Sequence, residues 1–264
     1  MNETRTDATD DVRRGALYRG LAMGLDRPDE EFARSLRSGT YGAELVAAAE
    51  GLGDETIADD AHEVADAAPA DADHLPFGDT FGVEGEDVVG LYEVAYSPGT
   101  LVTETNRLAD IAGFYGAFGI EIAAGQRERA DYLSIQLEFV QYLLLQRSYL
   151  LEQGDEEGVA VTTDALGAFL EDHLGRWAPR FAATVRETVD DAFYRARAAL
   201  LDAVVAADVE WLDVEPDVFE ETPQAPLEEI TGMERDEEGR LQFSCGAGSG
   251  PIDPAAAGEG GEQP

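Results

Sequence analysis

Residues 130–151 constrain the fold of this chain more than any other stretch. Large apolar side chains recur there at helical spacing and cover nearly the whole circumference, which predicts a central helix packed on several sides. They are Leu133, Ile135, Leu137, Phe139, Val140, Tyr142 and Leu144. Asp131 and Glu138 interrupt the apolar run, and a carboxylate in such surroundings needs a partner or a ligand to offset its desolvation. The stretch therefore predicts a fold element and a candidate site together.

Helical periodicity also dominates the rest of the chain, and almost no segment alternates with the period of a strand. We expect about eight to ten helices between roughly residues 10 and 211. Outside the central helix they cover about 10–25, 29–38, 41–52, 55–67, 103–119 and 163–174, with one more starting at Trp177 and a last one over about 193–209. Residues 153–161 are expected to form an acidic loop. Pro179 is expected near a first helical turn, where its missing N–H loses no partner.

The composition changes at residue 212. From there to residue 264 the chain is rich in proline, glycine and acidic residues, and it has too few apolar side chains to fold alone. The predicted organisation is therefore a single all-α domain over residues 10–211, followed by an acidic tail over residues 212–264 that is largely disordered.

The charge of the chain is extreme. Its 56 acidic and 18 basic residues give a formal net charge of -38, and every basic residue is arginine. Such a surface repels itself at low ionic strength, whereas concentrated salt screens it. We interpret the charge as adaptation to a salt-rich cytoplasm, as in a halophilic archaeon. A basic partner is the alternative, although the acidic residues are spread along the chain. Nucleic acid is not expected as a partner.

The single cysteine, Cys245, excludes an intramolecular disulfide and favours a reducing, cytoplasmic location. No stretch approaches about 18 uninterrupted apolar residues, so membrane insertion is not expected. Catalytic motifs are also missing. His62 and His74 each follow an aspartate by three residues, but a metal site in a helical bundle needs further carboxylates on facing helices. We expect no catalytic residue, metal or cofactor. A helical-bundle metalloenzyme is the alternative from another class.

Binding chemistry remains. Carboxylates and aromatic side chains around a helical groove suit a basic, apolar peptide, because carboxylates pair with arginines while aromatic and leucine side chains accept the apolar part. Asp131, near the helix start, is expected to meet such a ligand. Glu138, deeper in the apolar run, is expected mainly to hold the fold together. The alternative for Asp131 is a favourable interaction with the helix dipole alone.

Four ordered motifs resemble the TorD/DmsD/NarJ family, the cytoplasmic chaperones dedicated to molybdenum-containing oxidoreductases. Residues 91–99 resemble its Tyr-x-x-Leu-Phe-x-x-Pro segment, and residues 130–139 its Pro-Asp-His-Leu-x-x-x-Leu-Glu-Phe helix. Residues 169–181 match its Phe-x-x-x-His-Leu-x-x-Trp-x-x-x-Phe pattern, and residues 14–31 its first two helices. Tyr132 stands where the family usually has histidine.

The resemblance implies a TorD-like helical fold and a chaperone, not an enzyme. Its partner would be the apo catalytic subunit of a molybdopterin-containing oxidoreductase of the DMSO, TMAO or nitrate reductase type, together with its twin-arginine signal peptide. Binding would last until the cofactor is inserted and export is permitted. The chain would be a monomer or a helix-exchanged dimer. The rival within the class is a NarJ-like assembly factor that acts only on the mature body of the enzyme. The residues expected to bind the client are Tyr92, Glu93, Pro98, Asp131, Tyr132, Leu133, Gln136, Glu138, Phe139 and Trp177.

Overall fold

A computed structural model describes residues 2–81, 89–97, 101–121, 128–220, 233–235 and 241–243. The chain divides into two compact units, Met1–Pro223 and Gln224–Pro264.

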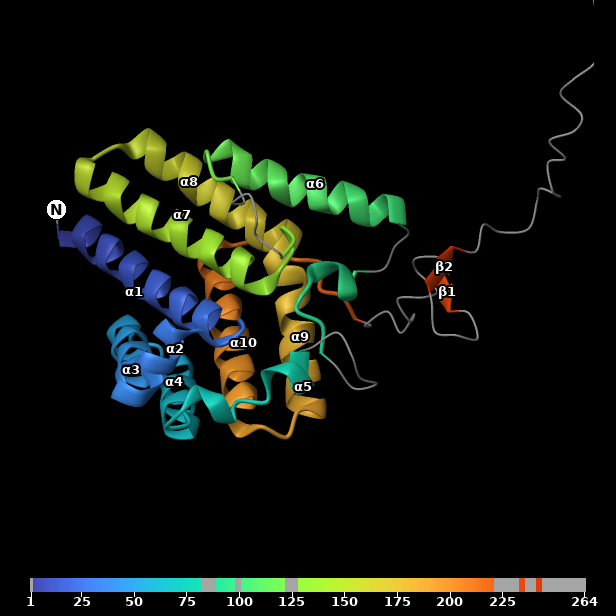
Figure 1. Ribbon diagram of the computed structural model, residues 1–264. Helices are drawn as coiled ribbons and strands as arrows, with labels where there is room; N and C mark the ends of the chain where they lie inside the picture. Colours follow the sequence, from blue (N-terminus) through green and yellow to red (C-terminus); the bar gives the residue numbers. More distant parts are fainter. Residues whose placement is uncertain are drawn as a thin grey trace, which may run out of the picture. The chain divides into compact units, whose positions relative to one another are not determined.

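The first unit is built from helices (Figure 1). The α-helices are α1 (Asn2–Gly24), α2 (Glu30–Ser38), α3 (Thr40–Leu52), α4 (Glu55–Ala67), α5 (Phe77–Phe81), α6 (Leu101–Ala117), α7 (Leu133–Gln153), α8 (Glu156–Phe169), α9 (Gly175–Thr188) and α10 (Ala192–Leu212). The shorter turns are η1 (Ala72–His74), η2 (Glu93–Ala95) and η3 (Leu170–Leu174), of which η3 is π-helical. The predicted all-α fold class is confirmed.

In the second unit, β1 (Met233–Arg235) pairs antiparallel with β2 (Leu241–Phe243), and Glu234 lies opposite Gln242. These strands belong to the predicted tail, whose other residues beyond 220 lie outside the described ranges. The predicted domain limits, 10–211 and 212–264, stay a prediction. Within the first unit, residues 213–219 follow α10 and pack back onto the helical domain.

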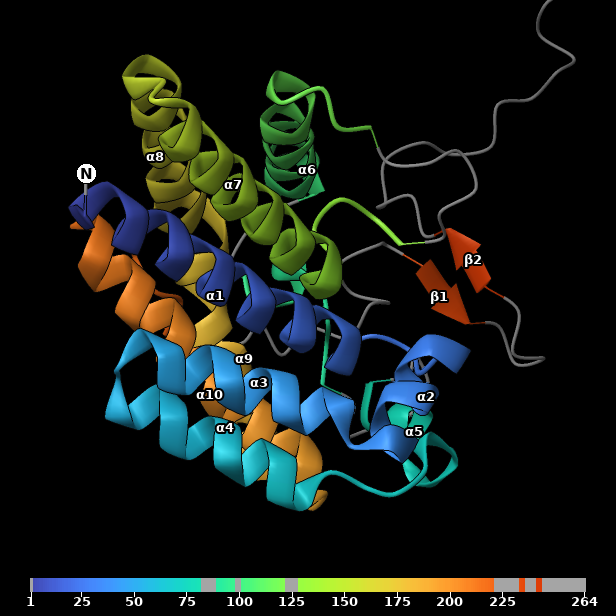
Figure 2. The same ribbon diagram turned by 90° about the vertical axis from the view of Figure 1, so that its left-hand side faces the viewer.

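The central helix α7 packs along α1 on one side and α8 on another (Figures 1 and 2). On the other side of α1, α3 pairs with α4, and α4 in turn contacts α10. Trp177, Phe181 and Tyr194 are among the largest fully buried side chains, so the core lies where α9 and α10 meet the rest of the bundle. Burial of this many apolar side chains is what stabilises helices that would be marginal alone.

Short polar residues begin several helices and glycines end them. Asp29, Asp54 and Asp191 each accept a hydrogen bond from a backbone N–H in the first turn of the helix that follows. Gly39 and Gly53 end α2 and α3 in the left-handed region, with φ of 73° and 76°. These signals are local, which is why the sequence locates most of the helices.

Two local expectations are wrong. Residues 153–161 are mostly helical, because Gly154 ends α7 and Asp155 at once caps α8 by accepting a hydrogen bond from the Gly158 N–H. Pro179 is not in a first turn but is the fifth residue of α9, since η3 continues α8 directly into α9. Figure 1 shows that the chain changes direction between α8 and α9. A π-helical turn inserts an extra residue per turn and is a known cause of such bends.

Helix α7 is less enclosed than its composition suggests. Leu133, Leu137 and Leu144 are fully buried. Tyr142, Leu145 and Tyr149 are 38%, 41% and 60% exposed and form an apolar strip on the surface of the helix. The expectation of packing on several sides therefore holds for most of the circumference and fails along this strip.

Candidate functional site

The start of α7 pairs with a distant segment through its backbone. The Leu133 N–H donates to the Leu91 carbonyl at 2.9 Å, and the Glu93 N–H donates to the Asp131 carbonyl at 3.1 Å. Between them Tyr92 and Tyr132 form an isolated antiparallel bridge. The first and second family motifs, about forty positions apart, thus meet side by side.

Glu93 is the centre of a buried polar network. Its side chain is fully buried and accepts hydrogen bonds from Arg107 Nη1 on α6 at 2.9 Å and from Gln136 Nε2 on α7 at 2.8 Å. His173 Nδ1 lies 3.3 Å from Glu93 Oε1. Burial alone would raise the pKa of Glu93, but the hydrogen bonds from His173, Arg107 and Gln136 hold it below its ordinary value.

Gln136 extends this network to α9. Its Oε1 accepts a hydrogen bond from Trp177 Nε1 at 3.0 Å, and the Trp177 ring stacks on Tyr96 with centroids 5.3 Å apart. A buried amide that uses both its donor and its acceptor leaves little desolvation uncompensated. Motif residues from η2, α7, η3 and α9 therefore act as one structural unit.

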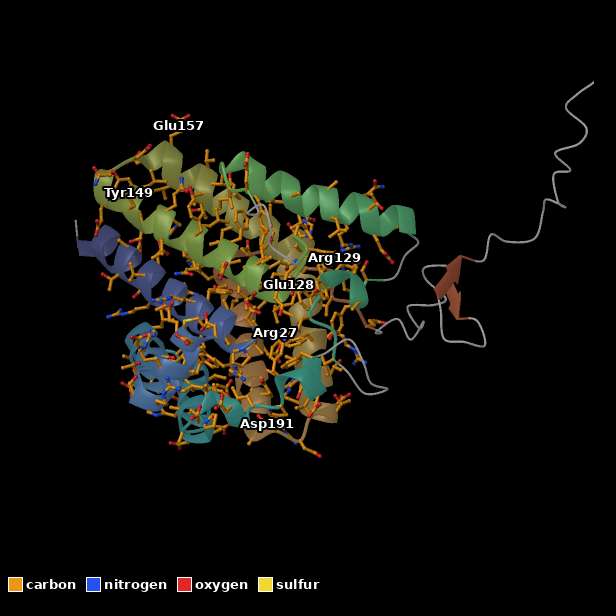
Figure 3. The ribbon with its side chains drawn as sticks, viewed as in Figure 1. Arg27, Glu128, Arg129, Tyr149, Glu157 and Asp191 are labelled. Carbon is orange, nitrogen blue, oxygen red and sulfur yellow. The ribbon has the colours of Figure 1, made fainter. Side chains whose placement is uncertain are left out.

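Asp131 is completely buried, contrary to its expected contact with a ligand. Its carboxylate accepts two hydrogen bonds from Arg129, at 3.0 and 2.9 Å, and one from the Val94 N–H at 3.3 Å. Arg129 also lies over the Tyr92 ring, 4.7 Å from its centroid, and the Tyr92 hydroxyl donates to Glu128. Figure 3 labels Glu128 and Arg129 beside the start of α7. Asp131 therefore stabilises the pairing of the segment around Tyr92 with the start of α7.

Tyr132 connects these paired segments to Asp26, which follows α1. Its hydroxyl donates to Asp26 Oδ1 at 3.1 Å, and Ser134 Oγ donates to Asp26 Oδ2 at 3.2 Å. Burial and the negative charge of Asp26 raise the pKa of Tyr132, so its hydroxyl stays protonated and remains a donor. Two side chains at the start of α7 thereby hold the Asp26 carboxylate in place.

Asp26 lines a pocket of about 410 Å³ between α1, α2 and α7. Four of its lining side chains are carboxylates, two are arginines, and Ala22, Met23 and Phe32 provide apolar walls. The charged residues are Asp26, Asp29, Glu31, Glu138, Arg19 and Arg27. Arg19 pairs with Glu31 at 3.1 Å, which leaves negative charge in excess near Asp26 and Glu138.

Glu138 is exposed on the wall of this pocket, so the burial expected for it and for Asp131 is reversed. Within the described parts of the chain, Glu138 makes no hydrogen bond or ion pair. Partial burial and the charge of Asp26 raise its pKa. A carboxylate without a cation beside a second carboxylate is a favourable place for a guanidinium group.

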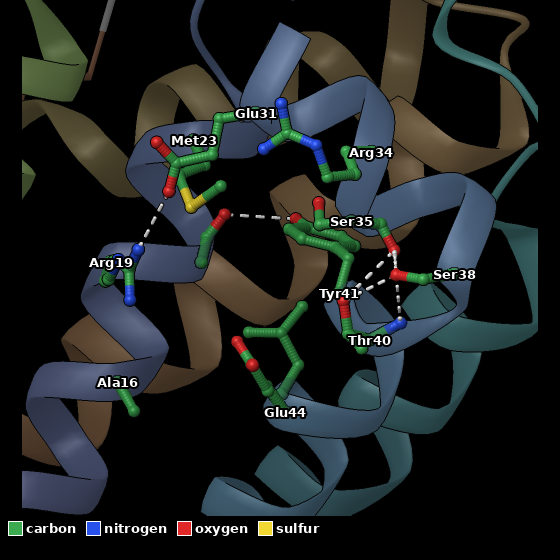
Figure 4. A pocket seen from close by; sticks show the side chains of 12 residues that line it. Ala16, Arg19, Met23, Glu31, Arg34, Ser35, Ser38, Thr40, Tyr41 and Glu44 are labelled. Atoms are coloured by element: carbon green, nitrogen blue, oxygen red, sulfur yellow. Dashed lines mark hydrogen bonds and ion pairs between the residues drawn. The ribbon is translucent and has the colours of Figure 1, made fainter.

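A second pocket, of about 250 Å³, lies between α1, α2 and α3 and shares Arg19, Met23 and Glu31 with the first (Figure 4). Tyr41 on its wall donates to the Gly20 carbonyl at 3.0 Å. Ser38 and Thr40 hydrogen-bond to each other at 2.8 Å. Several of its polar side chains, unlike Glu138, thus have a hydrogen-bond partner within the domain.

The structure separates the predicted client-binding residues into three groups. Buried in the scaffold are Glu93, Asp131, Tyr132, Leu133, Gln136, Phe139 and Trp177. Tyr92 is half-buried and Glu138 is exposed. Pro98 lies outside the described residues.

Sequence reasoning missed the importance of Asp26, Asp29 and Met23. In the sequence, Asp26 lies only in the connection between two expected helices, 10–25 and 29–38. Its signal, two carboxylates after an amphipathic helix, is common in turns and carries no ligand information alone. His173 lies in the third motif, but it is not among the residues expected to bind the client.

The described residues contain neither a membrane-spanning helix nor a cluster of metal ligands. No helix there combines the length and the apolarity needed to cross a bilayer. No group of three or more histidine, cysteine, aspartate or glutamate side chains there is arranged to hold a metal ion.

Comparison with known proteins gives a family match. The family model described as nitrate reductase delta subunit matches residues 44–183. This range includes the buried network and all of α7, whereas α1 and α2 precede it.

Three relatives of the chain are named as chaperones. The chain is 27% identical over 204 residues to the perchlorate reductase assembly chaperone protein of Dechloromonas aromatica (strain RCB), covering 75% of this chain and 89% of the relative. It is 30% identical over 122 residues to the selenate reductase assembly chaperone protein of Thauera selenatis, covering 46% and 61%. It is 35% identical over 112 residues to the chaperone protein TorD of Vibrio cholerae, covering 40% and 46%.

Proposed function

The chain belongs to the nitrate reductase delta subunit family, and on this premise we propose that it is a cytoplasmic chaperone for the catalytic subunit of a molybdopterin-containing oxidoreductase. It holds the subunit in its apo form while the cofactor is inserted. It also binds the twin-arginine signal peptide of that subunit until export is permitted.

Family membership confirms the resemblance seen in the four motifs. The relatives are chaperones by name, so the chain is a chaperone and the prediction that it is not an enzyme is confirmed. What we propose beyond this is the kind of enzyme that serves as the client and the binding of its signal peptide.

One face of α7 is the proposed binding surface for the signal peptide. Glu138, Tyr142, Leu145 and Tyr149 are spaced by four, three and four residues, so they share one side of the helix. This face begins at the acidic pocket and continues as the exposed apolar strip. It spans about 16 Å at the helical rise of 1.5 Å per residue. Carboxylates followed by apolar side chains complement a peptide in which arginines precede an apolar run.

Electrostatics favour the same ligand. Asp26 and Glu138 repel each other across the pocket, and an arginine guanidinium placed between them would relieve that repulsion while donating to both. Concentrated salt screens this attraction, so the apolar strip provides most of the affinity in a salt-rich cytoplasm.

Fluorescence anisotropy with a labelled peptide, two arginines followed by about ten apolar residues, tests the assignment. Glu138→Gln should weaken binding about fivefold at 0.1 M KCl, because an exposed charge pair contributes about 1 kcal/mol. Tyr149→Ser should weaken it at 0.1 M and at 2 M KCl alike. Glu187→Gln, an exposed glutamate on α9 that lines neither pocket, is the matched control and should bind as the wild type does.

Equal affinities for the wild type and the Glu138→Gln and Tyr149→Ser variants would contradict the use of this face. A second peptide, with glutamine in place of both arginines, should respond to Tyr149→Ser but no longer to Glu138→Gln. The rival assembly-factor role is separated by co-purification, because a factor that acts only on the mature body retains a client that lacks its signal segment.

A further inference from the structure

Residues 214–219, which follow α10, lie across α8 and the start of α9 as a short strap. The strap is preceded by Asp213, whose φ of 53° is the one positive φ among the described non-glycine residues and turns the chain back at the end of α10. Its contact with the domain is close at Gly175, where an added Cβ would lie 2.9 Å from Pro216 Cγ.

One aromatic side chain anchors the strap. Phe219 is buried between two guanidinium groups, with Arg176 of α9 at 4.7 Å and Arg107 of α6 at 5.2 Å from its ring centroid. Its backbone N–H donates to the Arg176 carbonyl at 2.9 Å. Cation–π contacts of this kind contribute modestly unless they are desolvated.

The two strap residues before Phe219 are held weakly. Arg176 Nε donates to the Asp217 carbonyl at 3.1 Å, and its Nη2 lies 3.5 Å from a carboxylate of Asp217 that is 94% exposed. Val218 is exposed as well. Exposed ion pairs add little stability, so Phe219, the buried residue of the strap, holds its end on the domain.

The surface beneath the strap has a donor that the strap does not satisfy. Arg107 is 13% exposed and donates through Nη1 to Glu93, but its buried Nε has no acceptor within the described residues. Phe219 offers Arg107 only the face of a ring. A carboxylate or carbonyl oxygen reaching Arg107 Nε would satisfy a group whose isolation is costly.

We propose that the Arg107–Arg176 surface binds a short acidic segment with one aromatic side chain in a partner protein, and that residues 214–219 cover it until that segment displaces them. The sequence of the strap, Val-Glu-Pro-Asp-Val-Phe, is itself acidic with one aromatic residue and occupies the surface as an intramolecular substitute. The partner is the client of the chaperone, which rests on the proposed function, whereas peptide binding at this surface does not.

A fluorescein-labelled peptide with the sequence of residues 213–221 tests the proposal on the full chain by anisotropy. The tethered strap competes at high effective concentration, so Phe219→Ala should bind the peptide about tenfold more tightly than the wild type. Val218→Ala, an exposed neighbour in the same strap, should leave the affinity unchanged. Phe219→Ala combined with Arg176→Ala should lose the gain, and a peptide with alanine at the phenylalanine position should not bind.

Hydrogen exchange in the wild type gives an independent readout if Phe219→Ala folds poorly. Saturating peptide should accelerate exchange of the Phe219 amide, because displacement removes its bond to the Arg176 carbonyl. Unchanged exchange at saturation, or equal peptide affinity for the wild type and a folded Phe219→Ala chain, would overturn the proposal. The signal peptide probe for the α7 face carries arginines, so failure there leaves this result unaffected.

Discussion

Glu93 shows how one residue ties distant motifs together. The carboxylate joins α6, α7 and η3 through Arg107, Gln136 and His173, and it is itself fully buried. Removing its charge leaves a guanidinium without its anion, which is far more costly than the net contribution of the intact pair. Such a residue is expected to matter for folding and not for contact with a client.

Glu93→Gln should lower the free energy of unfolding at pH 7 by about 3 kcal/mol, the cost of breaking a buried pair. The pKa of Glu93 is lowered from 4.5 in the folded chain, so its stabilisation is present above pH 4.5 and is lost as the pH falls through the folded pKa. The difference between wild type and variant should therefore shrink below pH 4.5. Urea denaturation across this range measures it.

The control for this substitution is Glu171→Gln, an exposed glutamate on η3 beside the network. It should change the free energy of unfolding by less than about 0.5 kcal/mol both at pH 7 and below pH 4.5. A Glu93→Gln difference that stays constant down to pH 3 would mean that the carboxylate is not held ionised by its partners.

Close packing between helices limits which side chains can stand at the contact. Gly42 lets α3 approach α4, since an added Cβ would lie 2.8 Å from Ala65 Cβ and 3.0 Å from its Cα. The backbone of α4 cannot move aside as a flexible side chain could. The glycine is therefore retained in a helix interior despite its poor helix propensity.

Gly42→Ala should destabilise the chain by about 1–2 kcal/mol, because overpacking outweighs the gain in helix propensity. Gly113→Ala in α6 is the matched change, since no described atom lies within 4 Å of the added Cβ, and it should stabilise by up to about 1 kcal/mol. Thermal melts of both variants measure these effects. A stabilising Gly42→Ala would show that α3 and α4 are less tightly packed than described.

The whole molecule is governed by its charge of -38. Mutual repulsion among carboxylates acts on the folded chain more than on the expanded unfolded chain, because the charges lie closer together. Salt shortens the range of this repulsion to a few ångströms. Salt should therefore stabilise this fold, although it weakens the exposed ion pairs.

Raising KCl from 0.1 to 2 M should increase the midpoint of thermal unfolding by about 5–10 °C, which corresponds to about 2–3 kcal/mol for a chain of this length. Differential scanning calorimetry measures it, with sorbitol at equal osmolality as the uncharged control. A midpoint that is flat or falls with KCl would contradict adaptation to a salt-rich cytoplasm.

The sequence by itself determined the helices and the family, because both depend on local information. Periodicity and caps such as Asp29 and Asp191 act within a few residues, and the motifs can be aligned without knowing what they contact. Only the tertiary structure decided the roles within the site. Asp131 and Glu138 looked alike on an apolar helix, but burial depends on which distant segment covers each position. Residues 91–93 cover Asp131, whereas Glu138 faces the pocket next to Asp26, and no spacing along the chain encodes that difference.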